Sequence, residues 1–426
     1  MIESLAEWNE WWSSGKIDPE LVGRKRKHTE NAEGILSFKE IKTITGIRRS
    51  GKSTLLYQFI DYLLKSKKVD PSHILFVNFE DPILSKATLE EIFDSYQIHI
   101  NSDKKPYLFL DEVHRCKEWA LFLRKLYDLR KIKQAFITDS SSKFIKSEYA
   151  SVITGREVNI TVFPLSFAEF LAWNGIKTNP PYARDRINRI KNMLNIYLQW
   201  GGLPEVVLRT SDTQKKILLN DYLSDIVHKD IIERYNANYQ KIKGLIDFLV
   251  ANPGTLFSPR KYSRTYGLSL DAINTYSAYL EEVFLFFPVP KFDYSVRKQQ
   301  LSPKKMYLCD TGFYGGTGFR FTENKGRTYE NAVFIELKRK GYEVYYWRGE
   351  GECDFVVKDG TKLSTAIQVC YDIVPSAKER EVKGLLEAMD ALKLKHGMII
   401  SENVEKSEKI GKKSVRYIPL WKYLLS

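Results

Sequence analysis

Short apolar runs alternate with amphipathic stretches along the amino-terminal third of the chain. Four runs rich in β-branched and aromatic residues are predicted strands: 40–45, 72–81, 105–112 and 134–138. The stretches 55–64 and 119–130 carry apolar residues at helical spacing and are predicted helices. Such alternation is typical of an α/β domain.

The rest of the chain shows two other patterns. Helices are predicted at 184–197 and 215–234. A second module begins at 241–252, and its residues 258–284 have helix-turn-helix spacing, with β-rich segments 286–292 and 304–309 behind them. A last α/β segment follows, with a helix at 329–340 and strands at 342–348, 352–357, 366–371, 398–400 and 415–420.

The loop after the first predicted strand matches the phosphate-binding pattern G-x-x-x-x-G-K-[ST]. Its candidate nucleotide contacts are Gly46, Arg48, Arg49, Ser50, Gly51, Lys52, Ser53 and Thr54. Glycines let the backbone turn its N–H groups towards phosphate, and a helix that begins there favours an anion. We expect Lys52 to contact the β- and γ-phosphates and Ser53 to bind Mg²⁺. Arg48 and Arg49 either clamp phosphate or link neighbouring subunits.

The predicted strand 105–112 ends in two acids, which is the Walker B pattern. We expect Asp111 to hold Mg²⁺ and Glu112 to polarise the attacking water. After strand 134–138, Ser140 is the candidate sensor of the γ-phosphate. Arg156 is a candidate for stabilising transition-state charge, in cis or across a subunit interface, and a surface salt bridge is the competing interpretation.

Three further segments near these motifs carry predictions, and the first two leave alternatives open. Gly23-Arg24 precedes the first strand and is either a nucleotide-base contact or part of a solvated basic run. Glu80 and Asp81 follow the second strand and either approach Mg²⁺ or cap the next helix. The indoles of Trp8, Trp11 and Trp12 are predicted to pack against a larger domain.

Composition and charge narrow the class of protein. The chain has 426 residues, 43% of them hydrophobic, which predicts two to four globular domains. A formal net charge of +13 favours polyanionic partners. The four cysteines are widely spread, which argues against a disulfide framework or a zinc site, and no apolar run is long enough for a membrane span. We therefore expect a cytoplasmic protein.

Taken in order, six segments resemble the AAA+-type ATPases related to STAND NTPases: 46–54, 110–112, 138–142, 154–156, 163–171 and 201–205. The tryptophan-rich leader is similar to that of archaeal members. Asp139 stands where the family usually has a glycine. The resemblance implies ATP and Mg²⁺ as cofactors and a homo-oligomer, with a hexameric ring as one form. It also implies four parts: a P-loop ATPase core (1–175), a helical lid (176–238), a winged-helix domain (239–318) and a PD-(D/E)xK nuclease-like domain (319–426).

The two carboxyl-terminal parts carry the predicted partner chemistry. A basic face of the winged helix is expected to contact DNA phosphates, or else the module makes only protein contacts: Arg260, Lys261, Arg264, Arg297, Lys298, Lys304 and Lys305, with Tyr262 and Tyr266 among them. In the nuclease-like part, Glu330 and Asp354 match the two acids, but Gln368-Val369-Cys370 replaces E-x-K. We therefore expect a degenerate domain, although an amide oxygen can still bind Mg²⁺ weakly.

These features favour a Mg²⁺-dependent ATPase that couples ATP hydrolysis to DNA binding, translocation or remodelling. A STAND-like ATP-driven switch with protein partners and an ATP-dependent nuclease are the alternatives.

Overall fold

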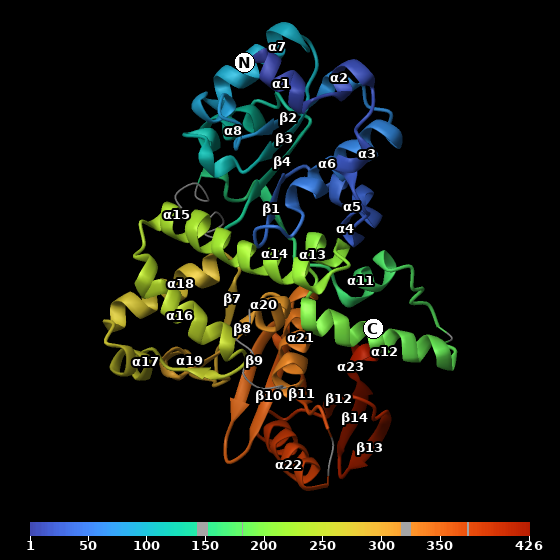
Figure 1. The fold of residues 1–426 in the computed structure, drawn as a ribbon, viewed down its shortest axis with the longest axis vertical. Helices are drawn as coiled ribbons and strands as arrows, with labels where there is room; N and C mark the ends of the chain where they lie inside the picture. Colours follow the sequence, from blue (N-terminus) through green and yellow to red (C-terminus); the bar gives the residue numbers. More distant parts are fainter. Residues whose placement is uncertain (143–151, 181, 317–324, 373–374) are drawn as a thin grey trace. The chain divides into compact units, whose positions relative to one another are not determined.

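A computed structural model describes residues 1–142, 152–180, 182–316, 325–372 and 375–426. The chain divides into two compact units, which are described separately: residues 1–162 with 282–284, and residues 163–281 with 285–426 (Figure 1). Among the described residues, no helix combines the length and the apolar character needed to cross a membrane.

The first unit contains a parallel sheet in the order β2-β3-β4-β1-β5. Its strands are β1 (Ile41–Thr45), β2 (Ile74–Asn78), β3 (Tyr107–Asp111), β4 (Gln134–Asp139) and β5 (Glu157–Thr161). Its α-helices are α1 (Ile2–Trp8), α2 (Trp11–Ser14), α3 (Pro19–Val22), α4 (Lys27–Glu30), α5 (Ala32–Ser37), α6 (Lys52–Lys65), α7 (Leu89–His99) and α8 (Trp119–Asp128). The four predicted strands of this unit are confirmed as β1 to β4, and β5 is an additional strand.

Both faces of this sheet are covered. Successive side chains of β3 point to opposite faces, so that Leu108 and Leu110 pack with α7 and α8, whereas Phe109 packs with α6. Burial on both faces explains why β2 and β3 are nearly continuous apolar runs. The arrangement is that of a P-loop NTPase core.

The tryptophan-rich leader packs on the edge strand β2, as expected. The indole N–H groups of Trp11 and Trp12 both donate to the carbonyl of Ile74, at 3.2 and 2.8 Å. Asn9 is buried and bonds both backbone groups of Phe76 through its side chain, donating at 2.8 Å and accepting at 2.7 Å. The leader thereby satisfies backbone groups that an edge strand would otherwise expose.

The second unit begins with helices. They are α11 (Phe167–Trp173), α12 (Arg184–Trp200), α13 (Pro204–Leu208), α14 (Asp212–Asp225), α15 (Glu233–Tyr235) and α16 (Tyr239–Ala251). The single helix predicted at 215–234 contains a π-helical segment, Ile226–Ile232, between α14 and α15. Next come α17 (Pro259–Tyr266) and α18 (Leu270–Glu282), separated by Gly267 in the left-handed region at φ +68°.

Two sheets complete this unit. A small antiparallel sheet has the order β6-β8-β7, with β6 (Leu256–Phe257), β7 (Phe286–Val289) and β8 (Lys304–Leu308), and α19 (Val296–Leu301) lies between β7 and β8 in sequence. A mixed sheet has the order β13-β14-β12-β11-β10-β9. Its strands are β9 (Glu343–Arg348), β10 (Glu352–Asp359), β11 (Lys362–Val369), β12 (His396–Ser401), β13 (Lys406–Ile410) and β14 (Lys413–Pro419).

The mixed sheet also has helices on both faces. One face packs with α12, α21 (Lys325–Arg339) and α23 (Leu420–Tyr423), and α20 (Gly312–Gly316) lies against α12. The other face packs with α22 (Pro375–Ala391). The predicted helix and strands of this segment are confirmed, and β13 is an additional strand.

Candidate nucleotide-binding site

The phosphate-binding loop turns sharply between β1 and α6. Gly46 has φ +151°, and a Cβ atom added there would lie 2.2 Å from the carbonyl oxygen of Val162, so only glycine fits. Gly51 has φ +94° and directly precedes α6, which begins at Lys52. The Lys52 ammonium is buried and donates to the carbonyl oxygens of Gly46 at 3.1 Å and Ile47 at 3.3 Å. The lysine therefore lies within the loop, where a phosphate would meet it.

Asp111 lies at the carboxyl end of β3 and faces the start of α6. Burial raises the pKa of its carboxyl group, whereas hydrogen bonds from Thr138 and Ser53 and the charge of Lys52 act to lower the pKa. Ser53 and Asp111 are thus brought together beside Lys52. A hydroxyl and a carboxylate oxygen are ligands that Mg²⁺ prefers, so this pair fits the predicted metal.

Glu112 follows Asp111 in a left-handed conformation, at φ +53°, and its side chain is buried. Burial raises its pKa to about 7, Lys52 acts against this, and the charges of Asp111 and Asp139 add to it. Its Oε2 atom accepts no hydrogen bond from the described residues, and His114 Nδ1 lies 3.4 Å away. A buried carboxylate with an unused oxygen is suited to accept a proton from water.

The sensor strand β4 lies between β3 and β1. The register pairs Thr45 of β1 with Asp139 of β4, so Ser140 adjoins the start of the phosphate-binding loop, where it is fully buried. The residue that reaches the Walker B acids is Thr138, whose hydroxyl contacts Asp111 at 2.5 Å and Glu112 N at 2.9 Å. Local sequence pattern does not predict this role of Thr138, because the role depends on the adjacency of β3 and β4.

The segment before β1 lies against the loop, where a nucleotide-base contact was expected. Arg26 donates to the carbonyl oxygen of Ser50 at 2.7 Å. The side chain of Gln58 donates to the carbonyls of Val22 at 2.9 Å and Arg24 at 2.8 Å. These bonds hold the backbone on either side of Gly23 beside α6.

The remaining loop residues and the acids after β2 have different surroundings. Arg48 is buried and lies 3.5 Å from Glu80, whereas Arg49 is exposed and has φ +68°. Asp81 accepts hydrogen bonds from the backbone N–H groups of Ile83 and Leu84 through Oδ1, and from the side chains of Ser4 and Trp8 through Oδ2. Both of its oxygens are therefore engaged by the following turn and by the leader.

Arg156 lies at the amino ends of the parallel strands, opposite the ends that carry the phosphate-binding loop. Its guanidinium contacts Asp128 at 2.8 Å and 3.3 Å, and its carbonyl accepts from the N–H of Ile41 at the start of β1. Because β1 runs from Ile41 towards the phosphate-binding loop, Arg156 is at the amino edge of the parallel sheet. The structure does not bring it to the loop of its own chain.

In the second unit the predicted basic face is only partly present. Six of its cations are exposed: Arg260, Lys261, Arg264, Arg297, Lys298 and Lys304. Tyr266 is also exposed, but Lys305 and Tyr262 are buried, at 4% exposure each. These two residues were wrongly placed on the face because the side of a strand or helix that packs inwards depends on its neighbours.

The acids of the nuclease-like segment do come together. Glu330 of α21 and Asp354 of β10 both contact the Lys305 ammonium, at 2.9 and 3.0 Å. The side-chain oxygen of Gln368 accepts from Asp354 N at 3.1 Å, so the amide oxygen expected to bind Mg²⁺ weakly is already bonded.

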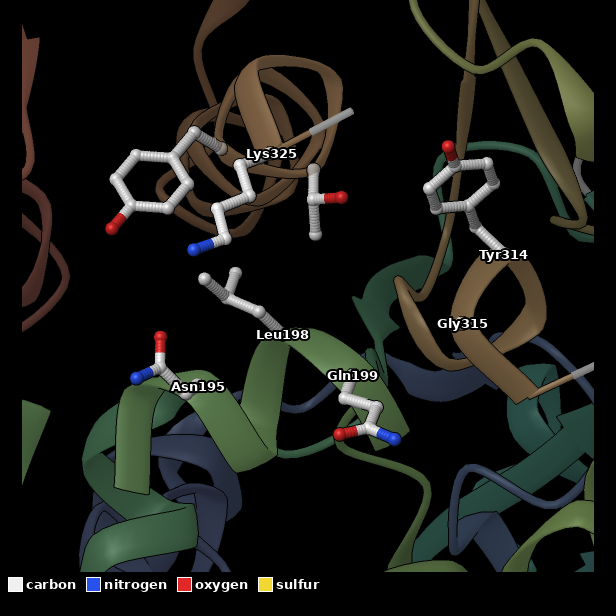
Figure 2. A pocket seen from close by; sticks show the side chains of 8 residues that line it. Asn195, Leu198, Gln199, Tyr314, Gly315 and Lys325 are labelled. Atoms are coloured by element: carbon white, nitrogen blue, oxygen red, sulfur yellow. The ribbon is translucent and has the colours of Figure 1, made fainter. Parts of the chain in front are cut away.

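A separate pocket of about 210 Å³ lies among α12, α20 and α21 of the second unit. Figure 2 shows Asn195 and Gln199 on one side of it and Lys325 on another. It contains none of the predicted site residues.

Comparison with protein families gives three matches along the chain. Residues 38–171 match the AAA domain family, and residues 191–318 and 325–423 match two families described as domains of unknown function. Among solved structures, the Aeropyrum pernix ORC1 protein in complex with DNA is 11% identical, with a TM-score of 0.33, over 68% of this chain and 91% of that chain. The STAND protein PH0952 from Pyrococcus horikoshii is 14% identical, with a TM-score of 0.29, over 78% of this chain and 47% of that chain. Similarities this weak carry no functional information.

Full-length relatives are closer in sequence. The uncharacterized protein MJ1544 of Methanocaldococcus jannaschii is 31% identical over 404 residues, 91% of this chain and 88% of that protein. An uncharacterized protein of Haemophilus influenzae is 29% identical over 82% of this chain and 87% of that protein. The chain therefore belongs to the family of MJ1544, and residues 38–171 match the AAA domain family, in agreement with the P-loop NTPase fold of the first unit.

Proposed function

We propose that this protein is a Mg²⁺-dependent ATPase that couples ATP hydrolysis to DNA binding, translocation or remodelling. The observation that carries the ATPase part is the convergence of Lys52, Ser53 and Asp111 beside Glu112 at the carboxyl edge of the sheet. ATP hydrolysis needs these groups: a cation for the phosphates, oxygen ligands for Mg²⁺ and a base for water.

Each side chain has a defined task in this proposal. Lys52 neutralises charge on the β- and γ-phosphates, and Ser53 and Asp111 hold Mg²⁺, which when bound draws charge from the phosphate oxygens. Glu112 orients the attacking water and takes up its proton. Ser140 contacts the γ-phosphate from the end of β4. The segment around Gly23 contacts the base.

Two substitutions test the ATPase assignment. Lys52→Ala is expected to abolish or strongly weaken ATP binding, because the loop loses its cation. Glu112→Gln is expected to bind ATP normally and to hydrolyse it far more slowly, because an amide does not accept the proton. Binding of a fluorescent ATP analogue and phosphate release measure the two effects. Normal turnover by Glu112→Gln would overturn the assignment.

The DNA part rests on the exposed cations of α17, α19 and β8. Arg260, Lys261 and Arg264 belong to one helix, which is followed by the left-handed turn at Gly267 and by α18. We propose that this helix-turn-helix and the β6-β8-β7 sheet form a winged helix that contacts DNA phosphates. Such contacts make affinity fall as salt rises, because each neutralised phosphate releases counterions.

The triple variant Arg260→Ala, Lys261→Ala, Arg264→Ala tests this surface. We expect weaker DNA binding at 50 mM salt, a shallower salt dependence and less DNA stimulation of the ATPase. Lys409→Ala with Lys412→Ala removes exposed charge from another part of the chain and is the control. If ATP turnover ignores every DNA tested and no binding is detected at low salt, the DNA part is lost and the regulatory switch with protein partners takes its place.

We further propose a homo-oligomer, with a hexameric ring as one form. Light scattering of the wild-type protein with and without ATP measures this, and a monomer under both conditions would exclude it. Active nuclease is the remaining alternative. DNA cutting that requires Mg²⁺ and vanishes in Asp354→Ala would establish that alternative instead of a degenerate carboxyl-terminal domain.

A further inference from the structure

A lysine occupies the acidic centre of the nuclease-like segment. The Nζ atom of Lys305 lies 2.9 Å from Glu330 Oε1, 2.8 Å from Glu352 Oε1 and 3.0 Å from Asp354 Oδ1, and its side chain is 5% exposed. An ammonium group has three N–H donors. Lys305 donates hydrogen bonds to Glu330 and Asp354 and forms an ion pair with Glu352, so three carboxylates from two elements, α21 and β10, surround this cation.

The alternation of side chains along β8 places Lys305 in the acidic centre. Lys304 is exposed, whereas Lys305 is buried on the opposite side of the strand. Tyr307, two residues further on, shares the side of Lys305 and donates a 2.5 Å hydrogen bond from its hydroxyl to Glu330 Oε1. One face of β8 thus supplies both donors to the acidic centre.

One of the three carboxylates, Asp354, also has its other oxygen engaged. Asp354 Oδ2 accepts from Val369 N at 3.0 Å. The side chain of Gln368 accepts from Asp354 N at 3.1 Å and donates to Glu381 at 2.5 Å. Gln368 is therefore held beside the centre by Asp354 and Glu381. Within the described ranges, no three His, Cys, Asp or Glu side chains are arranged to hold a metal ion.

The pKa shifts of Lys305 and Glu330 are consistent with this arrangement. Burial acts to lower the pKa of Lys305, but Tyr307, Asp354, Glu330 and Glu352 together keep it well above its usual value. Burial also raises the pKa of Glu330 to about 7, the charge of Asp354 adds to this, and Lys305 opposes it. The centre thus holds an ammonium group among three carboxylates.

We propose that Lys305 is a resident cation, which occupies the position among Glu330, Glu352 and Asp354 where a nuclease-like centre would take a divalent metal. The residues present do not fit the metal that the PD-(D/E)xK resemblance implies. The ammonium instead joins the small β6-β8-β7 sheet to α21 and β10, and the centre binds no divalent cation while Lys305 is in place.

Substitution of Lys305 by methionine tests this inference. Methionine keeps an unbranched apolar side chain that is one atom shorter and removes the charge, so three buried or half-buried carboxylates lose the counter-ion that Lys305 provides. In EDTA the thermal midpoint of nucleotide-free Lys305→Met is expected to fall by about 5 °C or more. Addition of MnCl₂ should restore part of the loss, and electron paramagnetic resonance should count one more bound Mn²⁺ per chain than in the wild-type protein.

Two further variants are compared with Lys305→Met: a control at the neighbouring lysine and a double variant. Lys304→Met removes the neighbouring exposed charge and should unfold and bind Mn²⁺ as the wild-type protein does. Lys305→Met combined with Asp354→Asn removes the cation and one opposing charge, so it should regain stability without responding to Mn²⁺. A double variant as unstable as Lys305→Met alone would count against the proposal. So would Lys305→Met that is unchanged in EDTA and takes no extra Mn²⁺.

Measurements on the wild-type protein complete the test. If it binds a Mn²⁺ ion that is lost in Asp354→Asn, the carboxylates accept a metal despite Lys305, and the proposal is overturned. None of these readouts involves ATP or DNA, so their outcome is independent of the proposed function.

Discussion

The hydroxyl of Thr138 donates a 2.5 Å hydrogen bond to Oδ1 of Asp111. The same oxygen of Thr138 accepts from the backbone N–H of Glu112 at 2.9 Å. One side chain of β4 therefore fixes both the proposed metal ligand and the proposed base, and it does so where Glu112 adopts a left-handed backbone conformation at φ +53°. This geometry makes Thr138 a positioning residue of the proposed ATPase.

Thr138→Val keeps the shape of the side chain and removes both hydrogen bonds. We expect kcat for ATP hydrolysis to fall by about 10- to 100-fold, with a higher Mg²⁺ requirement and little change in ATP binding. Steady-state kinetics over a Mg²⁺ titration measure the effect. Thr138→Ser retains the hydroxyl and should recover most of the activity. Wild-type kinetics in Thr138→Val would show that the two acids are held without it.

The contrast between this residue and the phosphate-binding loop shows what the sequence can predict. The loop, β1 and α6 are contiguous, so local pattern was enough to find Lys52 and Ser53. Thr138 acts through the pairing of β3 with β4, and β5 depends on pairing with β1, from Ile41 opposite Glu157. Neither long-range pairing is encoded in local spacing.

The same limit explains why Lys305 was wrongly predicted to lie on the basic face. Alternation along β8 predicts that Lys304 and Lys305 point to opposite sides. It does not predict which side meets the acids of α21 and β10, because those acids are brought there by the fold of a later segment. A buried lysine among three carboxylates was therefore assigned to a basic surface.

Asn9 is expected to be important for the stability of the first unit. Its side chain satisfies the N–H and C=O groups of Phe76 on the edge strand β2 and is 1% exposed. Asn9→Ala leaves both groups buried and unpaired, so we expect a loss of about 2–3 kcal/mol in the free energy of unfolding. Urea unfolding followed by tryptophan fluorescence measures this.

Ser13→Ala is the matched control for Asn9, because Ser13 also donates to a backbone carbonyl, that of Glu10, but on an exposed surface. It should unfold like the wild-type protein. An Asn9→Ala protein as stable as the control would mean that water replaces the asparagine at the sheet edge.

Lys42 predicts a pH dependence of stability. This residue of β1 is 0% exposed, donates to the carbonyl of Phe38 at 2.5 Å, and burial lowers its pKa from 10.5 to about 8. Below pH 8 both the folded and the unfolded chain carry the proton, so folding bears the full cost of burying the charge. Between about pH 8 and 10.5 the unfolded chain binds more protons, and this cost is lost as the pH rises. The difference corresponds to at most about 3 kcal/mol.

Lys42→Met removes this cost at every pH. We expect the variant to be more stable than the wild-type protein at pH 7, and the advantage to shrink as the pH approaches 10. Urea midpoints of both proteins at one-unit intervals of pH measure the difference. An advantage that does not change with pH would mean that Lys42 keeps its usual pKa in the folded protein.

Arg156 can act on ATP only in a neighbouring subunit, because in its own chain it lies at the amino edge of the sheet, paired with Asp128. We therefore predict that Arg156→Ala binds ATP and loses hydrolysis by about 1000-fold or more, as expected for a lost arginine that stabilises transition-state charge. Glu112→Gln should be similarly slow, for a different reason. A mixture of the two inactive proteins should regain part of the activity, because a subunit with an intact Glu112 then receives Arg156 from its neighbour. If Arg156→Ala hydrolyses ATP at the wild-type rate, the arginine serves only as the surface partner of Asp128. Removal of such a surface ion pair changes the free energy of unfolding by no more than about 1 kcal/mol.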